Sequence, residues 1–260
     1  MKLSIITVTF NNYEELIRTF ESIKSLKGEM EWVVVNGGDC EKTREFLQEK
    51  PIENFSFVTE KDEGIADAFN KGAKLSEGEN LLFLNSGDLL FNTDYIRWAI
   101  EKLNEDRSLA FTHGDILFTD CEFGQLRMRP HGESVGRGMP YYHQTMVINK
   151  ACFEKAGGFD KSFKIAMDYE LVCRMEKAEM KGLYYEGEPV CLMDGSGVSR
   201  TQEGKSLKEA KRALKQNGLF WTPSVFFAFQ KRVIFYSLRR LMDLLGLKDH
   251  LKRLKQKKYS

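Results

Sequence analysis

One short apolar run constrains the fold more than any other part of this sequence. Leu81–Leu84 contains only apolar residues, and Asn85-Ser86-Gly87-Asp88 ends the run abruptly. A continuous apolar run of this length is typical of a strand at the centre of a sheet that is covered on both faces. Open α/β sheets bind ligands beyond the carboxyl ends of their strands, which is where Asp88 falls. The run therefore predicts a buried sheet with an acidic ligand site at its edge.

An alternation of short strands and helices extends this prediction over the first 112 residues. We expect strands at Leu3–Phe10, Trp32–Val35, Phe55–Thr59, Leu81–Leu84 and Leu109–Thr112. Between them we expect helices at Tyr13–Ser25, Thr43–Glu49 and Ile65–Leu75, and one from Thr93 or Asp94 to about Leu103. This order is typical of an α/β fold with a doubly wound, mainly parallel central sheet.

The regular alternation ends after residue 112. Glycine and proline are scattered through Asp115–Tyr142, which favours a short antiparallel meander and a substrate-facing loop. Further on we expect strands at Thr145–Asn149 and Tyr184–Met193, the second interrupted near Pro189, and helices at Lys150–Ala156, Asp168–Met180 and Ser206–Asn217. We therefore expect one α/β domain over residues 1–205, divided near residue 112, and a helical extension over residues 206–260.

Charge is distributed unevenly along the chain. The formal net charge is +1, but residues 231–260 contain ten Lys or Arg and two Asp, so they carry +8 and the rest carries −7. Apolar residues recur at helical spacing in the extension, at Phe227, Ile234, Leu238, Leu241 and Leu245, beside the basic Lys231, Arg232, Arg239 and Arg240. Such a basic amphipathic helix suits an anionic membrane surface. A helix docked on its own domain or in a dimer fits the same pattern.

Cysteine usage and the amino terminus indicate the compartment. The five cysteines are odd in number and scattered without a CxxC motif, which argues against a disulfide framework or a zinc site. A β-branched strand follows Met1-Lys2 directly, without a signal-peptide cleavage site. We expect a cytoplasmic protein that lies peripherally on the inner face of the cytoplasmic membrane. GxGxxG and GxxxxGK[ST] motifs are absent, which weakens dinucleotide-binding and P-loop interpretations.

Four blocks along the chain resemble, in their order, the family 2 glycosyltransferases, which have the GT-A fold. The blocks are Val8–Asn11, Lys61–Gly72, Asn85–Asp88 and Gly157–Leu171. The resemblance runs from Ser4 to about Arg200, and the most similar branch acts in bacterial O-antigen, capsule or exopolysaccharide assembly. It implies an enzyme that uses a nucleotide-sugar. Residues 1–112 would bind the nucleotide, residues 113–205 would face the acceptor, and no nucleic-acid partner is expected.

The resemblance also implies a donor site and a metal. Its donor-binding residues would be Thr9, Asn11, Asn36, Asp62, Asp67, Asn70 and Asp88. Asn36 stands where the family often has an Asp that recognises uracil. Asp88 would bind Mn²⁺ or Mg²⁺, which neutralises the leaving diphosphate, although Ser86 replaces the first carboxylate of the usual Asp-x-Asp. Purely structural roles stay open: Asp62 and Asp88 as caps, and Asn70 as an ordinary exposed residue.

The block around Asp168 resembles the family segment in which an Asp at a helix start acts as catalytic base. Met167 replaces the Glu of the usual Glu-Asp pair. One carboxylate suffices to take the proton of an attacking sugar hydroxyl, with inversion at the anomeric carbon. Residues of the preceding segment would contact the diphosphate or the acceptor, namely Arg129, His131, Arg137, His143 and Gln144. A helix cap at Asp168 and a solvated basic loop are the structural alternatives.

Together these features predict a metal-dependent, inverting glycosyltransferase. We expect it to move a hexose or N-acetylhexosamine from a UDP-sugar to a hydroxyl of a glycan, including one linked to a polyprenyl diphosphate. A nucleotide-sugar-binding or scaffold protein without activity is the alternative, because Asn36, Ser86 and Met167 depart from the family pattern. A nucleotidyltransferase would require a glycine-rich basic loop after the first strand, which Thr9–Tyr13 lacks.

Overall fold

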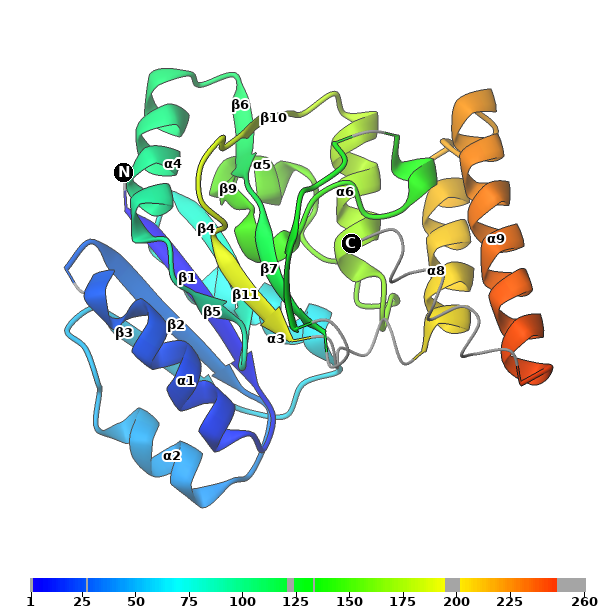
Figure 1. Ribbon diagram of the computed structural model, residues 1–260. Helices are drawn as coiled ribbons and strands as arrows, with labels where there is room; N and C mark the ends of the chain where they lie inside the picture. Colours follow the sequence, from blue (N-terminus) through cyan, green and yellow to red (C-terminus); the bar gives the residue numbers. More distant parts are fainter. Residues whose placement is uncertain (1, 27, 121–123, 133, 195–201, 247–260) are drawn as a thin grey trace.

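A computed structural model of the protein describes residues 2–26, 28–120, 124–132, 134–194 and 202–246. Its centre is a seven-stranded sheet with the order β10-β6-β9-β4-β1-β2-β3 (Figure 1). The strands are β1 (Leu3–Thr9), β2 (Met30–Asn36), β3 (Phe55–Thr59), β4 (Asn80–Asn85), β6 (Leu109–His113), β9 (Val147–Asn149) and β10 (Lys181–Tyr184). Only β9 runs antiparallel to its neighbours β4 and β6. The mainly parallel α/β sheet is therefore confirmed.

A second, four-stranded sheet stands at the carboxyl side of the first. Its order is β5-β11-β7-β8, formed by β5 (Leu89–Leu90), β7 (Ile116–Asp120), β8 (Gly124–Met128) and β11 (Cys191–Asp194). The strand expected at Tyr184–Met193 is in fact two strands, β10 and β11, which belong to different sheets. Pro189 lies between them, where a residue without an N–H cannot continue a ladder.

Helices cover both faces of the main sheet. One face packs against α1 (Tyr13–Ile23), α2 (Glu41–Gln48) and α4 (Thr93–Glu105). The other packs against α3 (Ile65–Leu75), α5 (Lys150–Lys155) and α6 (Met167–Lys177). Along β1, Leu3 and Ile5 face the first layer while Ile6 and Val8 face the second, as the two-residue period of a strand requires. Short 3₁₀ helices in the described ranges connect some of the elements: η1 (Lys24–Leu26), η2 (Val135–Arg137) and η3 (His143–Thr145).

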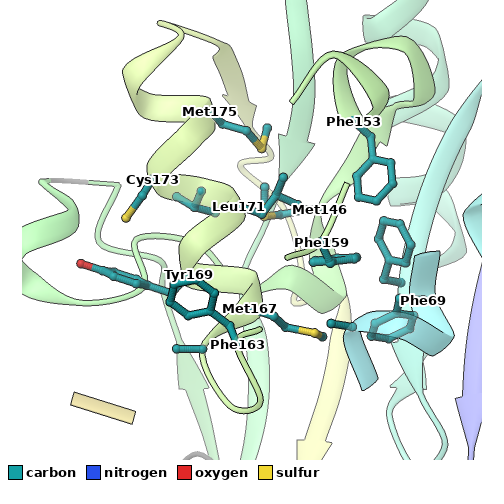
Figure 2. Close-up of a cluster of buried hydrophobic side chains, with 14 of the residues drawn as sticks. Phe69, Met146, Phe153, Phe159, Phe163, Met167, Tyr169, Leu171, Cys173 and Met175 are labelled. Carbon is teal, nitrogen blue, oxygen red and sulfur yellow. The ribbon is translucent and has the colours of Figure 1, made fainter. Parts of the chain in front are cut away.

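An aromatic cluster fixes the start of α6 over the sheet. The rings of Phe69, Phe153 and Phe159 lie 5.3–5.7 Å apart between centroids where they pair, and all three are buried. Figure 2 shows Met167 and Leu171 on the side of α6 that faces this cluster. Because these side chains anchor its first turns, α6 begins at a fixed place near the edge of the sheet.

The C-terminal extension packs on the α/β domain through one face. It contains α8 (Glu203–Gln216) and α9 (Pro223–Leu244), so the expected boundary at residue 205 falls in the first turn of α8. Leu214 of α8 and Val225 and Phe229 of α9 belong to the same core as α6. The apolar stripe of the other α9 face is 52–70% exposed at Phe227, Ile234, Leu238, Leu241 and Leu245. One face of α9 therefore docks on the domain, while the opposite, apolar face is exposed.

Within residues 2–246, apart from the short undescribed gaps, no helix combines the length and the apolar character that a bilayer crossing requires.

Candidate active site

Four side chains meet beyond the carboxyl end of β4. Asp88 follows a turn in which Gly87 adopts a φ of 100°, a conformation that favours glycine. Asp88 Oδ2 accepts hydrogen bonds from the Asn85 backbone N (3.0 Å) and from Asn85 Nδ2 (3.1 Å). Asp88 is only 6% exposed. The turn thus fixes a buried carboxylate at the sheet edge, the place that the sequence predicts.

His143 joins this turn to the start of α6. Its Nδ1 lies 3.3 Å from Asp168 Oδ2, and its Nε2 lies 3.5 Å from Asn85 Nδ2. Asp168 is in the first turn of α6, where its Oδ1 accepts a hydrogen bond from the Tyr169 backbone N (2.7 Å). Asp168 Oδ2 lies beside the imidazole. Because the side chain is 25% exposed, the Asp168 carboxylate still reaches the protein surface.

The local charges determine the protonation of this cluster. Burial lowers the pKa of His143, but the hydrogen bond to Asp168 and the charges of Asp168 and Asp88 outweigh it, so the pKa is raised. Burial raises the pKa of Asp88, against the opposing effects of His143 and of the Asn85 hydrogen bonds. The pKa of His143 and the pKa of Asp88 are therefore both raised where the two side chains meet.

Few side-chain atoms at this site could act as ligands of a divalent cation. Nowhere in the described parts of the chain do three His, Cys, Asp or Glu side chains come together as a metal site. Asp88 supplies carboxylate oxygen and His143 supplies imidazole nitrogen, ligand types that Mn²⁺ accepts. These residues fit a cation only when a bound ligand contributes the remaining oxygen atoms, as a diphosphate would.

A second group of predicted residues surrounds Gly37 and Gly38 after β2. Asn11 has a φ of 52°, and its Oδ1 accepts hydrogen bonds from the backbone N of Asp39 (2.8 Å) and of Cys40 (3.0 Å). A side chain at Gly37 would collide with Asp62 Oδ2, and one at Gly38 would collide with Asn11. The glycines therefore allow Asn11, Asp62 and the end of β2 to form one compact corner.

Two more predicted residues end the first strands at this corner. Asn36 is fully buried, and its Oδ1 accepts a hydrogen bond from the Gly38 backbone N (3.1 Å). Thr9 Oγ1 is buried without a hydrogen-bond partner among the described residues. The structure thus brings Thr9, Asn11, Asn36 and Asp62 together, because the carboxyl ends of neighbouring parallel strands meet at one edge.

Comparison with known proteins identifies the family. Residues 4–162 match the sequence profile described as Glycosyl transferase family 2. The chain belongs to this family. An uncharacterized glycosyltransferase of Mycobacterium tuberculosis is 27% identical over 178 residues, which cover 66% of this chain and 68% of that protein.

Solved structures share the GT-A fold of this glycosyltransferase. TarS of S. aureus, residues 1–349 in complex with UDP, matches with a TM-score of 0.65 and 17% identity over 84% of this chain and 65% of its own. The mannosyltransferase PcManGT of Pyrobaculum calidifontis, in complex with GDP-Man and Mn²⁺, matches with a TM-score of 0.62 and 16% identity. That match covers 96% of this chain and 80% of PcManGT.

Two residues that the resemblance assigns to donor binding make hydrogen bonds and ion pairs with other residues of the glycosyltransferase. Asn70 Nδ2 donates to the Phe159 backbone O (2.8 Å), and Asn70 Oδ1 accepts from the Phe159 backbone N (2.9 Å). Asp67 Oδ2 accepts from the Glu63 backbone N (3.1 Å), and Lys71 and Lys161 pair with the same carboxylate. These contacts hold α3 against the loop before α6. Asn70 and Asp67 therefore support the structure around the site.

The residues expected to face the acceptor separate into different places. Gln144 is buried beside Met193 and near Asp88. Arg129 instead lies over the Tyr184 ring, 5.2 Å from its centroid, and His131 is exposed in the loop after β8. Arg137 ends η2 and lines a cavity next to α9. Of this set the structure brings only His143 and Gln144 to Asp88.

Two side chains at the site were not among the predicted residues. Asn85 links Asp88 to His143, and its place in Asn-Ser-Gly-Asp was a signal for it. Phe10 is 68% exposed and lies against Gly37, so it offers a flat apolar surface beside the Asn36 corner. Gly197-Val198-Ser199, near the end of the stretch that resembles the family, lies outside the described residues.

Proposed function

We propose that this glycosyltransferase transfers a hexose or N-acetylhexosamine from a UDP-sugar to a glycan hydroxyl, with inversion, in bacterial surface-polysaccharide assembly. The observation that carries the proposal is the position of Asp168. Its carboxylate stands at the start of α6, 3.3 Å from His143, at the same sheet edge as Asp88. A base and a cation-binding carboxylate are the two groups that displacement of a nucleoside diphosphate requires.

The proposed reaction is a single displacement. The acceptor hydroxyl oxygen forms a bond to the anomeric carbon, while the bond from that carbon to the diphosphate oxygen breaks and its electron pair leaves with the diphosphate. Asp168 Oδ2 takes the hydroxyl proton as the bond forms. His143 Nδ1 donates a hydrogen bond to the same oxygen atom and so orients the carboxylate.

A divalent cation fits the proposed reaction. Asp88 would hold it, with His143 nearby and diphosphate oxygens completing the shell. When bound, the cation neutralises the charge that develops on the leaving diphosphate. The family likeness and the Mn²⁺ in the PcManGT complex support this assignment without choosing between Mn²⁺ and Mg²⁺.

The corner around Gly37 is the proposed nucleoside site. Asp62 offers a carboxylate there, and the exposed Phe10 ring offers a surface on which a base can stack. Asn36 is buried and supports the corner through its hydrogen bond from the Gly38 backbone N. The UDP in the TarS complex supports uridine as the base. Phe10→Ala should therefore weaken UDP binding by about tenfold, because loss of a stacking side chain costs roughly 1–3 kcal/mol per base.

Release of nucleoside diphosphate from a panel of nucleotide-sugars tests the proposed function. We expect release from a UDP-sugar in the presence of an acceptor, and we expect its loss in Asp168→Asn. Nucleotide-sugar binding with no release from any donor would favour the alternative, a binding protein without activity. Ser86 and Met167, which stand where the family has carboxylates, are the observations behind that alternative.

We further propose that α9 binds an anionic membrane surface through its exposed stripe. The stripe residues Ile234 and Leu238 are 57% and 52% exposed, and Lys231 and Arg240 are exposed on the same helix. Arg232 and Arg239 lie on the docked side and do not contribute. Shallow insertion of apolar side chains and attraction to anionic lipid act together.

Substitution in the stripe tests this surface better than truncation, because truncation would also remove the buried Val225 and Phe229. Ile234→Gln with Leu238→Gln should reduce sedimentation with anionic liposomes while the melting temperature stays unchanged. Ser237→Gln, on the same helix, is the matched control. An equal loss of melting temperature and liposome binding would mean that the stripe packs on protein instead.

A further inference from the structure

One hydroxyl group of α1 holds the turn that carries Asp88. Thr19 lies in the second half of α1, and its side chain is fully buried. Its Oγ1 donates a hydrogen bond to the Asp88 backbone O (3.0 Å) and accepts one from the Gly87 backbone N (2.9 Å). Because these two peptide groups flank the Gly87–Asp88 pair, a single side chain holds the turn from both sides.

The contact comes from a residue that does not favour the helix itself. A β-branched side chain lowers helix propensity, and a hydroxyl inside a helix can bond to the carbonyl oxygen one turn earlier. The Thr19 hydroxyl instead bonds to residues that are 68 and 69 positions away in the sequence. It therefore uses its proton and an acceptor site on the turn and not on α1.

The turn depends on such a contact because it contains a glycine. Gly87 has a φ of 100°, and glycine has more accessible backbone conformations than other residues. α1 also fills the space beside this residue, since a Cβ at Gly87 would lie 2.7 Å from Glu15 Oε2. Glu15 and Thr19 lie one helical turn apart, so one face of α1 packs on the turn. The position of the Asp88 carboxylate therefore depends on α1.

The same helix begins at the proposed nucleoside site. Asn11 precedes Asn12, the N-cap of α1, and its Oδ1 accepts the hydrogen bonds from the backbone N of Asp39 and Cys40. α1 thus extends from the nucleoside corner to the turn of Asp88. Thr19 is placed to fix the second of these parts of the donor site relative to the first.

We propose that Thr19 is a positioning residue for cation binding and acts through the backbone of the Asp88 turn. The inference rests on the proposed function, in which Asp88 holds a divalent cation against the leaving diphosphate. Thr19 is buried behind the turn and acts on the cation only through Asp88. Substitution of a residue that orients a metal ligand typically changes metal affinity or activity by about ten- to a hundredfold.

The affinity for UDP, measured by calorimetry with Mn²⁺ and again with EDTA, tests the inference without any turnover. Thr19→Val keeps the shape of the side chain but removes both hydrogen bonds to the turn. We expect its UDP affinity in EDTA to equal that of the wild type, because the nucleoside corner is unchanged. With Mn²⁺ we expect its UDP affinity to fall about tenfold. Thr19→Ser retains the hydroxyl and should bind UDP as the wild type does under both conditions.

Ser22→Ala is the matched control on the same helix. Ser22 Oγ accepts a hydrogen bond from the Leu90 backbone N (3.1 Å), two residues beyond Asp88, and donates one to the Thr19 backbone O (2.7 Å). The variant therefore also removes a hydrogen bond between α1 and the chain that follows β4. It should lower the melting temperature, as Thr19→Val does, but its UDP affinity with Mn²⁺ should stay at the wild-type value.

Three results would overturn the inference. Wild-type UDP affinity of Thr19→Val with Mn²⁺ would show that the hydroxyl supports only the fold. A tenfold loss in Ser22→Ala would assign the effect to the general packing of α1. A tenfold loss in Thr19→Ser would show that the hydrogen bonds are not its cause. The last two comparisons hold even if Thr19→Val does not fold.

Asp88→Asn in the same measurement separates this inference from the proposed function. If Mn²⁺ tightens UDP binding in the wild type and in Thr19→Val but not in Asp88→Asn, only the role of Thr19 is rejected. If Mn²⁺ leaves the UDP affinity of the wild type unchanged, the proposed cation site itself is rejected.

Discussion

Two histidines, His143 partly exposed and His113 buried, show how the surroundings of an imidazole decide what it can do. His143 lies beside Asp168 and near Asp88, and its pKa is raised even though burial alone would lower it. His113, at the end of β6, packs among aromatic rings, and burial lowers its pKa to about 4 against the opposing effect of Asp115. The two side chains are only 30 positions apart in the sequence, yet the pKa of His143 is raised and that of His113 is lowered.

The difference lies in what else binds the neighbouring carboxylate. Asp115 Oδ2 accepts from Arg127 Nε (2.6 Å), and Asp115 Oδ1 accepts from the Tyr184 hydroxyl (2.6 Å), so its charge is already compensated. Among the described residues, no lysine or arginine pairs with Asp88 or Asp168. Asp168 and Asp88 therefore remain available to bind a proton and a cation, whereas the contacts of Asp115 stabilise the fold.

Removing the carboxylate of Asp168 should give the largest effect. Asp168→Asn keeps the size of the side chain but cannot take the acceptor proton, and loss of a general base costs about two to four orders of magnitude in rate. We expect transfer to fall by this factor while UDP binding by calorimetry is unchanged. Asp160→Asn, which alters a carboxylate that bonds only within its own loop, is the control. Equal rates in the two variants would show that Asp168 is a helix cap.

Asp88→Asn should have the second-largest effect on the rate of transfer. Asparagine retains an oxygen that can accept the two Asn85 hydrogen bonds, but it loses the charge that would hold a cation. We expect transfer to fall by roughly a hundredfold, because charge neutralisation at the leaving group contributes several kcal/mol. The measurement is the rate as a function of added Mn²⁺ and Mg²⁺. An unchanged metal dependence would contradict the cation site.

The last effect concerns His113 and stability at acid pH, and not the rate of transfer. The folded-state pKa of His113, about 4, lies below the usual 6.5, so the fold favours the neutral ring. The stability that it contributes is complete above about pH 6.5 and is lost as the pH falls towards 4, by roughly 3 kcal/mol. His113→Phe should flatten this loss in urea unfolding at pH 7 and pH 4.5. The same pH dependence in the variant would place the titrating group elsewhere.

The sequence was most informative where local pattern alone decides the structure. The apolar run before Asp88 became the central strand β4, and α3 was predicted at its observed bounds, Ile65–Leu75. Asp168 was placed correctly at the start of a helix. Strand burial, helical periodicity and turn residues are properties of neighbouring residues, so one sequence reveals them.

Contacts between residues that are far apart in the sequence could not be predicted from local patterns. The amide of Asn70 bonds to the backbone of Phe159, 89 positions away, and no periodicity indicates such a partner. Similarly, Arg137 and Arg232 were assigned to a loop and to a membrane-facing helix, but the structure places both at one cavity. The extension shows the same limit, because a helix that is apolar on two opposite faces does not reveal which face docks.

The anomeric configuration of the product tests the central claim most directly. In the proposed reaction Asp168 alone removes the proton, and the displacement at the anomeric carbon is direct. A UDP-α-sugar donor should therefore give a β-linked product, which the anomeric coupling constant in a proton NMR spectrum distinguishes when the sugar has the gluco configuration. A β-linked product is the predicted result. An α-linked product would contradict direct displacement and, with it, the role assigned to Asp168.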